Sequence, residues 1–126
     1  MTPSRIRIAV ALFGAALSAA ALASGAIAAE RVEVASRVTL AQADPFHGKV
    51  LSRKAACERA RTVEVYRVDP GPDGLYDRTT SNTQGAWSIP AGTPNGKFYA
   101  VARQRTIDAP GRTIVCKRAT SPNVAF

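Results

Sequence analysis

Side chains that carry metal or phosphate chemistry are scarce in this sequence. Its 126 residues include two cysteines, Cys57 and Cys116, and one histidine, His47. Their spacing matches no zinc-ligand pattern. Glycine-rich phosphate loops are absent, as is the interleaving of aromatic and basic residues that single-strand nucleic-acid binders use. The sequence therefore predicts no cofactor and no nucleic-acid partner.

A catalytic constellation is also missing. His47 lies three residues from Asp44, but a triad also needs a nucleophile within reach and an oxyanion site, and neither is recognisable. The acidic residues lie in turns or at strand ends, and Glu64 is expected on an exposed face, so no carboxylate pair for glycoside hydrolysis is indicated. We expect no catalytic residues and a solvent-facing His47. A small secreted hydrolase stays open as an alternative, which a deep cleft with His47 beside a carboxylate would favour.

The amino-terminal segment has the pattern of an export signal. Arg5 and Arg7 precede an apolar run over Ile8–Ala23, and Ala26-Ile27-Ala28 fits the A-x-A cleavage pattern. Ala21-Leu22-Ala23 is an earlier candidate site. A transmembrane anchor is the alternative, but alanine and glycine contribute little transfer energy and no basic stop-transfer cluster follows. We predict a helical signal peptide over residues 1–29 and one secreted, extracellular domain over 30–126, without a membrane span.

Acidic residues are few beside the basic ones. The chain has 17 Lys and Arg against 9 Asp and Glu, and without Arg5 and Arg7 the mature charge is +6. Such a surface favours acidic partners, among them anionic glycans and cell-envelope polymers, although it could serve solubility alone. In an exported protein of this size, Cys57 and Cys116 are most simply a disulfide.

No long helical period occurs after the signal segment. Short runs of β-branched and aromatic residues alternate with Gly, Pro, Asn and Asp clusters, which is typical of an all-β domain. In the strand over 62–68, Val63 and Val65 are expected to point inward, and Trp87 is expected in the core. Strands are predicted over 37–40 (with an extension near Val32 and Val34), 46–52, 62–68, 75–80, 86–89, 97–103, 113–117 and 123–126. This gives a seven- to eight-stranded Greek-key β-sandwich.

Two groups of residues are candidate binding sites. Asp69, Asp73 and Asp77 surround a Pro- and Gly-rich turn and form a weak calcium candidate, since calcium prefers oxygen ligands. Their spacing departs from the EF-hand pattern, and aspartates are also ordinary turn formers. The second group is basic: the disulfide would draw residues around Cys57 toward those around Cys116 and make a positive patch. Its members are Arg53, Lys54, Arg59, Arg61, Lys117 and Arg118.

The order of several local patterns resembles a known family. The patterns are Phe46-x-Gly48-x-Val50-x-Ser52, Cys57, Arg61-x-Val63-x-Val65-Tyr66, Thr80 through Gly85-x-Trp87-x-Ile89, Asn95-Gly96-Lys97-Phe98-Tyr99-Ala100 and Cys116. Residues 38–126 thereby resemble the carboxypeptidase regulatory-like domains, which share the transthyretin-like (prealbumin-like) sandwich. The resemblance implies a non-catalytic module of secreted proteins. The fold's hydrolase branch needs several histidines and a carboxy-terminal Tyr-Arg-Gly-Ser, which this chain lacks. We therefore expect an extracellular accessory or binding protein, with binding of anionic glycans or the cell envelope through the basic patch as an alternative.

Overall fold

The computed structural model describes residues 29–41 and 46–126, which fold almost entirely as β-structure. The predicted signal peptide lies outside this part, apart from its last residue, and so does Asp44. The elements are β1 (Glu30–Val34), β2 (Ser36–Val38), β3 (Phe46–Ser52), the 3₁₀ turn η1 (Ala55–Cys57), β4 (Thr62–Arg67), β5 (Gly74–Thr80), β6 (Ala86–Ile89), β7 (Lys97–Ala102), β8 (Arg105–Ala109), β9 (Arg112–Cys116), β10 (Ala119–Thr120) and β11 (Val124–Ala125). No helix in these two ranges is long and apolar enough to cross a membrane.

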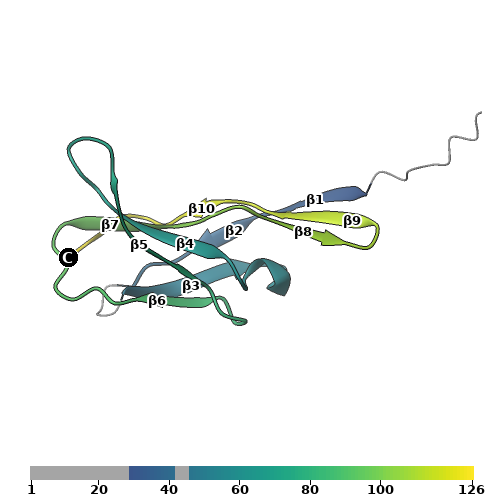
Figure 1. Ribbon diagram of the computed structural model, residues 1–126, viewed down its shortest axis with the longest axis horizontal. Coiled ribbons are helices and arrows are strands. Elements are labelled where there is room, and N and C mark those ends of the chain that lie inside the picture. Colours follow the sequence, from purple (N-terminus) through teal and green to yellow (C-terminus); the bar gives the residue numbers. More distant parts are fainter. Residues whose placement is uncertain (1–28, 42–45) are drawn as a thin grey trace, which may run out of the picture.

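Two sheets pack against each other and form an all-β sandwich (Figure 1). One has the strand order β10-β7-β4-β5, with β11 also paired to β7, and the other has the order β2-β3-β6. All pairs within these two sheets are antiparallel. Each sheet has one apolar face, and packing the two faces together removes both from water. The predicted all-β sandwich is confirmed.

Side-chain alternation determines which residues enter the core. Val63 and Val65 on β4 are fully buried, and Trp87 and Ile89 on β6 are 4% and 1% exposed. All four belong to one cluster that both sheets supply. Successive residues of a strand point to opposite faces, so the residues between them lie on the outer surfaces. The inward positions of Val63, Val65 and Trp87 were predicted correctly.

Aromatic rings fill one end of this core. Phe46, at the start of β3, has its ring centroid 5.0 Å from that of Phe98 and 4.8 Å from that of Phe126. Tyr76 meets Phe46 edge to face at 5.4 Å. Edge-to-face aromatic pairs contribute about 0.5–1.5 kcal/mol beyond the area they bury. The last residue of the chain is therefore part of the core, next to the short closing strand β11.

An arm made of β1, β8 and β9 extends the sandwich at one end (Figure 1). The chain passes from β7 into β8 and from β9 into β10, so that residues 97–120 form one long hairpin that turns at Gly111 (φ 72°). β1 joins β9 in parallel, from Glu30 opposite Arg112 to Val34 opposite Cys116. The strand extension expected near Val34 is therefore β1, but its partner lies outside the two sandwich sheets.

The strand β8 was not predicted. The sequence predicts strands over 97–103 and 113–117 joined through a turn at residues 108–111, with no strand between them. Arg105–Ala109 is a strand because its residues pair with β9, with Ile107 opposite Ile114, and so prolong the hairpin. Short alternating segments of this kind take their conformation from the partner strand.

The predicted disulfide between Cys57 and Cys116 is present, with 5.4 Å between the two Cα atoms. Cys57 lies in η1, below the arm, and Cys116 ends β9. Together with Val34 and Ile114 the two half-cystines form a second, smaller core. The bond therefore attaches the base of the arm to the loop that follows β3.

Candidate functional site

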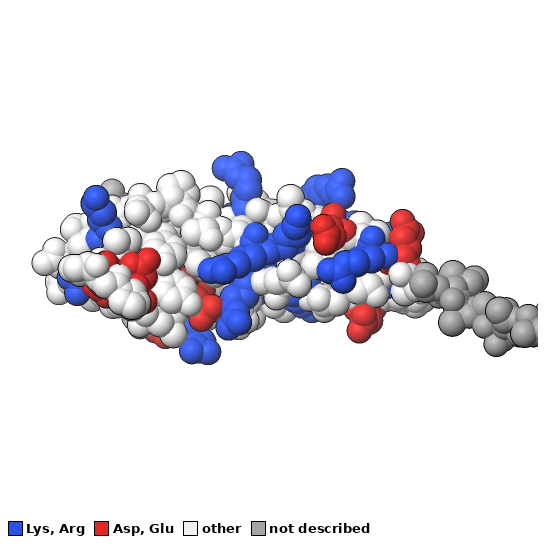
Figure 2. All heavy atoms as spheres, turned by 90° about the horizontal axis from the view of Figure 1, so that it is seen from above, with Lys and Arg blue, Asp and Glu red and all other residues white. Residues whose placement is uncertain are grey.

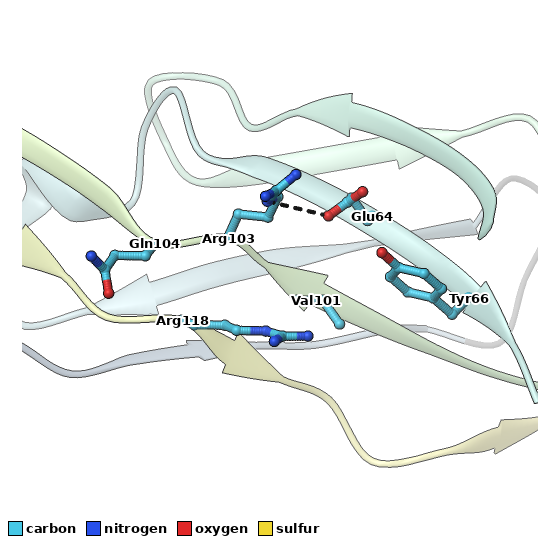
Figure 3. Close-up of a pocket in the computed structure, with 6 residues that line it drawn as sticks. All are labelled: Glu64, Tyr66, Val101, Arg103, Gln104 and Arg118. Atoms are coloured by element: carbon cyan, nitrogen blue, oxygen red, sulfur yellow. Dashed lines mark ion pairs between the residues drawn. The ribbon is translucent and has the colours of Figure 1, made fainter. Parts of the chain in front are cut away.

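The outer surface of the five-stranded sheet carries a hollow of about 330 Å³. Three groups of residues line it: Glu64 and Tyr66 from β4, Val101 from β7, and three residues from the two linkers that lead into the arm, namely Arg103, Gln104 and Arg118. In Figure 3 Arg103 and Glu64 face each other on one side of the hollow, the Arg118 guanidinium lies on the other side beside Val101, and Tyr66 and Gln104 lie at opposite ends. The hollow is thus built where the long hairpin passes from the sandwich into the arm.

Glu64 forms the floor of this hollow. It follows the inward-facing Val63, so it points to the outer face, and it lies opposite Val101 in the pairing of β4 with β7. The expectation that Glu64 is exposed was wrong: the residue is 6% exposed. β4 is an inner strand, so Glu64 has a neighbouring residue on each side, Arg78 on β5 and Val101 on β7.

An ion pair joins Glu64 to the mouth of the hollow. Arg103 Nε lies 3.5 Å from Glu64 Oε1, as the dashed line in Figure 3 shows, and the Arg103 side chain is 61% exposed. A buried carboxylate needs such a partner, because leaving it unpaired costs several kcal/mol. The Arg103 head therefore has one edge toward Glu64 and much of its surface in solvent.

Tyr66 belongs to a stacked pair of tyrosines. Its ring lies 5.5 Å from that of Tyr99 on β7, with 17° between the planes. The Tyr99 hydroxyl donates a 2.7 Å hydrogen bond to Asp73 Oδ2 in the β4–β5 turn. This bond raises the pKa of Tyr99, and burial and the charge of Asp73 raise it further. The pair gives the hollow a firm wall that is tied to the neighbouring turn.

Arg61, one of the six residues of the predicted basic patch, is not on the surface. It is fully buried, and its guanidinium donates four hydrogen bonds of 2.8–3.0 Å, namely Nε to Arg103 O, Nη1 to Ser36 Oγ and to Cys57 O, and Nη2 to Lys117 O. Three main-chain carbonyls and a hydroxyl thus take the place of a carboxylate partner. Including Arg61 in a surface patch was therefore wrong.

The burial of Arg61 affects its ionisation. Burial lowers the pKa of the guanidinium, and the nearby charge of Arg105 lowers it further. The group nevertheless stays protonated, since guanidinium does not lose its proton in proteins. Arg61 is therefore a buried cation that holds the linkers of the arm, and its role is structural.

The other members of the predicted patch lie in two different places. Arg118 lines the hollow described above, and Lys117 is exposed, with Nζ 3.6 Å from Glu33 Oε2. Arg53 lines a second hollow beside Leu51 and Glu58. Lys54 and Arg59 flank η1. The disulfide joins the segment around Cys57 to the segment around Cys116, but both half-cystines are buried between these segments. The basic residues therefore do not form one patch, and Arg53 and Arg118 line separate hollows.

Figure 2 shows the molecule of Figure 1 from above, so that β7, β9 and β10 lie on the face turned to the viewer. Lys and Arg side chains gather across its middle, and acidic side chains lie mainly toward its two ends. The hollow with Arg103 and Arg118 belongs to the outer surface of the sheet that includes β7 and β10. A ligand at the hollow therefore meets a surface that is mainly positive.

The three aspartates of the calcium candidate do not converge. Asp73 Oδ1 accepts a hydrogen bond from the Asp69 amide, and Asp73 Oδ2 accepts one from Tyr99. Asp77 Oδ1 accepts one from the Arg78 amide. In the part of the chain that is described, no three His, Cys, Asp or Glu side chains are grouped so that they could hold a metal ion. The aspartates act as ordinary turn and strand residues.

His47 lies on the exposed side of β3, as expected, directly opposite Ser88 on β6. The hollow lies on the other sheet, and the residues that line it do not include His47. Of the residues that line the hollow, the sequence indicates Arg118 as a binding residue but not Tyr66, Arg103 or Gln104. Strand alternation could have placed Tyr66 on the outer face, but only the pairing of β7 with β10 brings the two linkers together.

Comparison of the chain with protein-family models, curated proteins and solved structures gives no match.

Proposed function

We propose that this protein is a secreted, non-enzymatic binding module that binds anionic polymers, such as acidic glycans of the cell envelope. The observation that carries the proposal is that Arg103 and Arg118, which come from two different linkers, line the same hollow on the outer sheet face. Guanidinium groups bind carboxylate, sulfate and phosphate oxygens through paired hydrogen bonds. Compared with the patch proposed from the sequence, the binding surface moves from the loop around Cys57 to the sheet.

Two further features support this proposal. The disulfide and the absence, in residues 29–41 and 46–126, of a membrane-spanning helix are compatible with an extracellular protein. The arrangement of β2-β3-β6 against β10-β7-β4-β5 is compatible with the carboxypeptidase regulatory-like resemblance, which implies a non-catalytic module. Family membership is part of the proposal.

Binding to charged and uncharged polymers tests the proposal. The mature domain should bind polygalacturonate and dextran sulfate but not neutral dextran, and salt should weaken the binding, because exposed charges are screened over about 8–10 Å near physiological ionic strength. Replacing both Arg103 and Arg118 by alanine should weaken binding about tenfold, if each surface contact contributes roughly 0.5–1 kcal/mol.

A matched control has the same loss of charge on the other sheet. Arg37 on β2 and Lys49 on β3 are both exposed and lie away from the hollow. Their double alanine variant should bind almost as the unchanged protein does. Equal loss in the two variants would reduce the interaction to net charge, and no loss in the Arg103 and Arg118 variant would overturn the proposed function.

A further inference from the structure

We infer that the hollow around Val101 is a subsite for one uronate residue, a sugar that carries a carboxylate and several hydroxyl groups. This inference rests on the proposed function and adds the class of anion that the polymer contains. It depends on three side chains: Arg103, Arg118 and Glu64.

The two arginines supply the anion-binding part of the subsite. They come from different linkers, Arg103 after β7 and Arg118 after β9, and they line opposite sides of the hollow, Arg103 beside Glu64 and Arg118 beside Val101 (Figure 3). Arg103 has its Nε toward Glu64, and its side chain is 61% exposed at the mouth. A planar carboxylate fits the fork of a guanidinium with two parallel hydrogen bonds. The mouth of the hollow therefore suits a carboxylate.

Glu64 decides between classes of anion. Its side chain is 8% exposed at the floor, and an ionised carboxylate can only accept hydrogen bonds. A sulfate or phosphate group brings only acceptor oxygens and negative charge, so Glu64 repels it. A uronate places its charge at the arginines and can turn hydroxyl donors toward Glu64. The buried carboxylate thus favours a hydroxylated carboxylate over a fully sulfated sugar, which has no hydroxyl to donate.

The shape of the hollow suits one residue of a longer chain. Its volume of about 330 Å³ is at the lower end of the range of small-molecule sites. Tyr66 lies at one end and Gln104 at the other, and both add groups that can donate and accept hydrogen bonds. The hollow lies on an outer sheet surface, so a polymer can continue past it at both ends.

The Glu64→Gln variant gives the direct test. Titration calorimetry measures the binding of an oligogalacturonate and of a fully sulfated dextran oligomer, which has no free hydroxyl donors and is chosen to carry the same number of charges. The unchanged protein should prefer the uronate. In Glu64→Gln the uronate should bind about tenfold more weakly, the difference between a hydrogen bond to a charged acceptor and one to a neutral acceptor, and the sulfated oligomer should bind more tightly. The preference should therefore disappear or reverse.

The control variant is Asp108→Asn, which removes the same charge from an exposed position on β8. It should shift both affinities equally. A Glu64→Gln variant that also shifts both equally would overturn the inference, because Glu64 would then act only through net charge. Two results together would refute the uronate subsite and leave the proposed function standing. They are equal binding of uronate and sulfate by the unchanged protein, and loss of binding to both in the variant with Arg103 and Arg118 replaced by alanine.

A second measurement does not depend on a folded variant. Monomeric galacturonate is titrated into isotope-labelled protein, and the backbone amide signals are followed by NMR. Shifts centred on Val101 and Gln104 would support the subsite. Shifts centred elsewhere, or no shifts at concentrations where the oligomer binds, would refute it.

Discussion

Replacing Arg61 by methionine tests how the arm is joined to the sandwich. The guanidinium donates to the carbonyls of Cys57, Arg103 and Lys117 and to the hydroxyl of Ser36, at 2.8–3.0 Å. These four acceptors lie in η1, in the two linkers of the long hairpin and in β2. Methionine keeps an unbranched apolar chain of similar reach, so the variant removes the donors without opening a large cavity.

The expected cost follows from the acceptors that lose their donor. A buried polar group without a partner costs about 1–3 kcal/mol, and three carbonyls lose theirs. Part of this cost is offset because the variant no longer desolvates a buried cation, itself a penalty of several kcal/mol. We expect a net loss of about 3–5 kcal/mol in the free energy of unfolding, a large share of the roughly 5–15 kcal/mol of a typical domain.

Urea unfolding, followed by circular dichroism, measures this loss. With a slope of about 2 kcal/mol per M, the midpoint should fall by about 2 M. Arg61→Lys keeps the charge, but one ammonium group cannot reach four separated acceptors, so its stability should be intermediate. Arg112→Met, at an exposed position of β9, is the matched control and should change stability by less than about 0.5 kcal/mol. A loss below about 1 kcal/mol in Arg61→Met would refute the reasoning.

Three further predictions concern other parts of the fold. The Cys57–Cys116 bond joins residues 59 positions apart, so its reduction should lower the free energy of unfolding by up to about 4 kcal/mol through loop entropy. An unchanged melting temperature in the presence of reductant would contradict this. Within the described residues Trp87 Nε1 is a buried donor without an acceptor. Trp87→Phe should therefore change the free energy of unfolding by less than about 1 kcal/mol, because removal of the unpaired donor offsets the lost packing. A loss above about 3 kcal/mol, similar to that of a large core truncation, would show that the indole is needed. Because the bond to Asp73 raises the pKa of Tyr99, it stabilises the fold fully below the ordinary pKa of about 10, and this stabilisation is lost as the pH rises through the folded-state pKa. Asp73→Asn should therefore lower the pH at which the Tyr99 phenolate forms, as followed by ultraviolet absorbance. An unchanged midpoint would count against the bond.

The strands of the sandwich could be predicted because their signals are local. β3 and β6 have the predicted bounds, and β4 ends one residue earlier, since apolar alternation and turn residues specify them directly. β8 could not be predicted in this way. Its residues Arg105–Ala109 are mostly polar or small, and they form a strand because β9 lies beside them.

The site was predicted less well, because burial of charged residues depends on distant contacts. Arg61 looks in sequence like one more member of a basic cluster. Its burial depends on acceptors 25, 42 and 56 residues away, at Ser36, Arg103 and Lys117. Glu64 was assigned to the correct face of β4, but only pairing with β5 and β7 shows that this position is covered. Charge in a sequence therefore says little about which cations reach the surface.

The two linkers connect the stability of the arm with the geometry of the hollow. At residue 103 the carbonyl accepts from Arg61 inside, while the side chain pairs with Glu64 on the outer surface. On the other linker the Lys117 carbonyl accepts from Arg61, and the next residue, Arg118, lines the hollow. Arg61 thus holds, from within, the backbone that carries both arginines of the proposed anion site. An Arg61→Lys protein that still folds should consequently bind uronate more weakly although no surface residue has changed, and unchanged binding would show that the linkers keep their positions without Arg61.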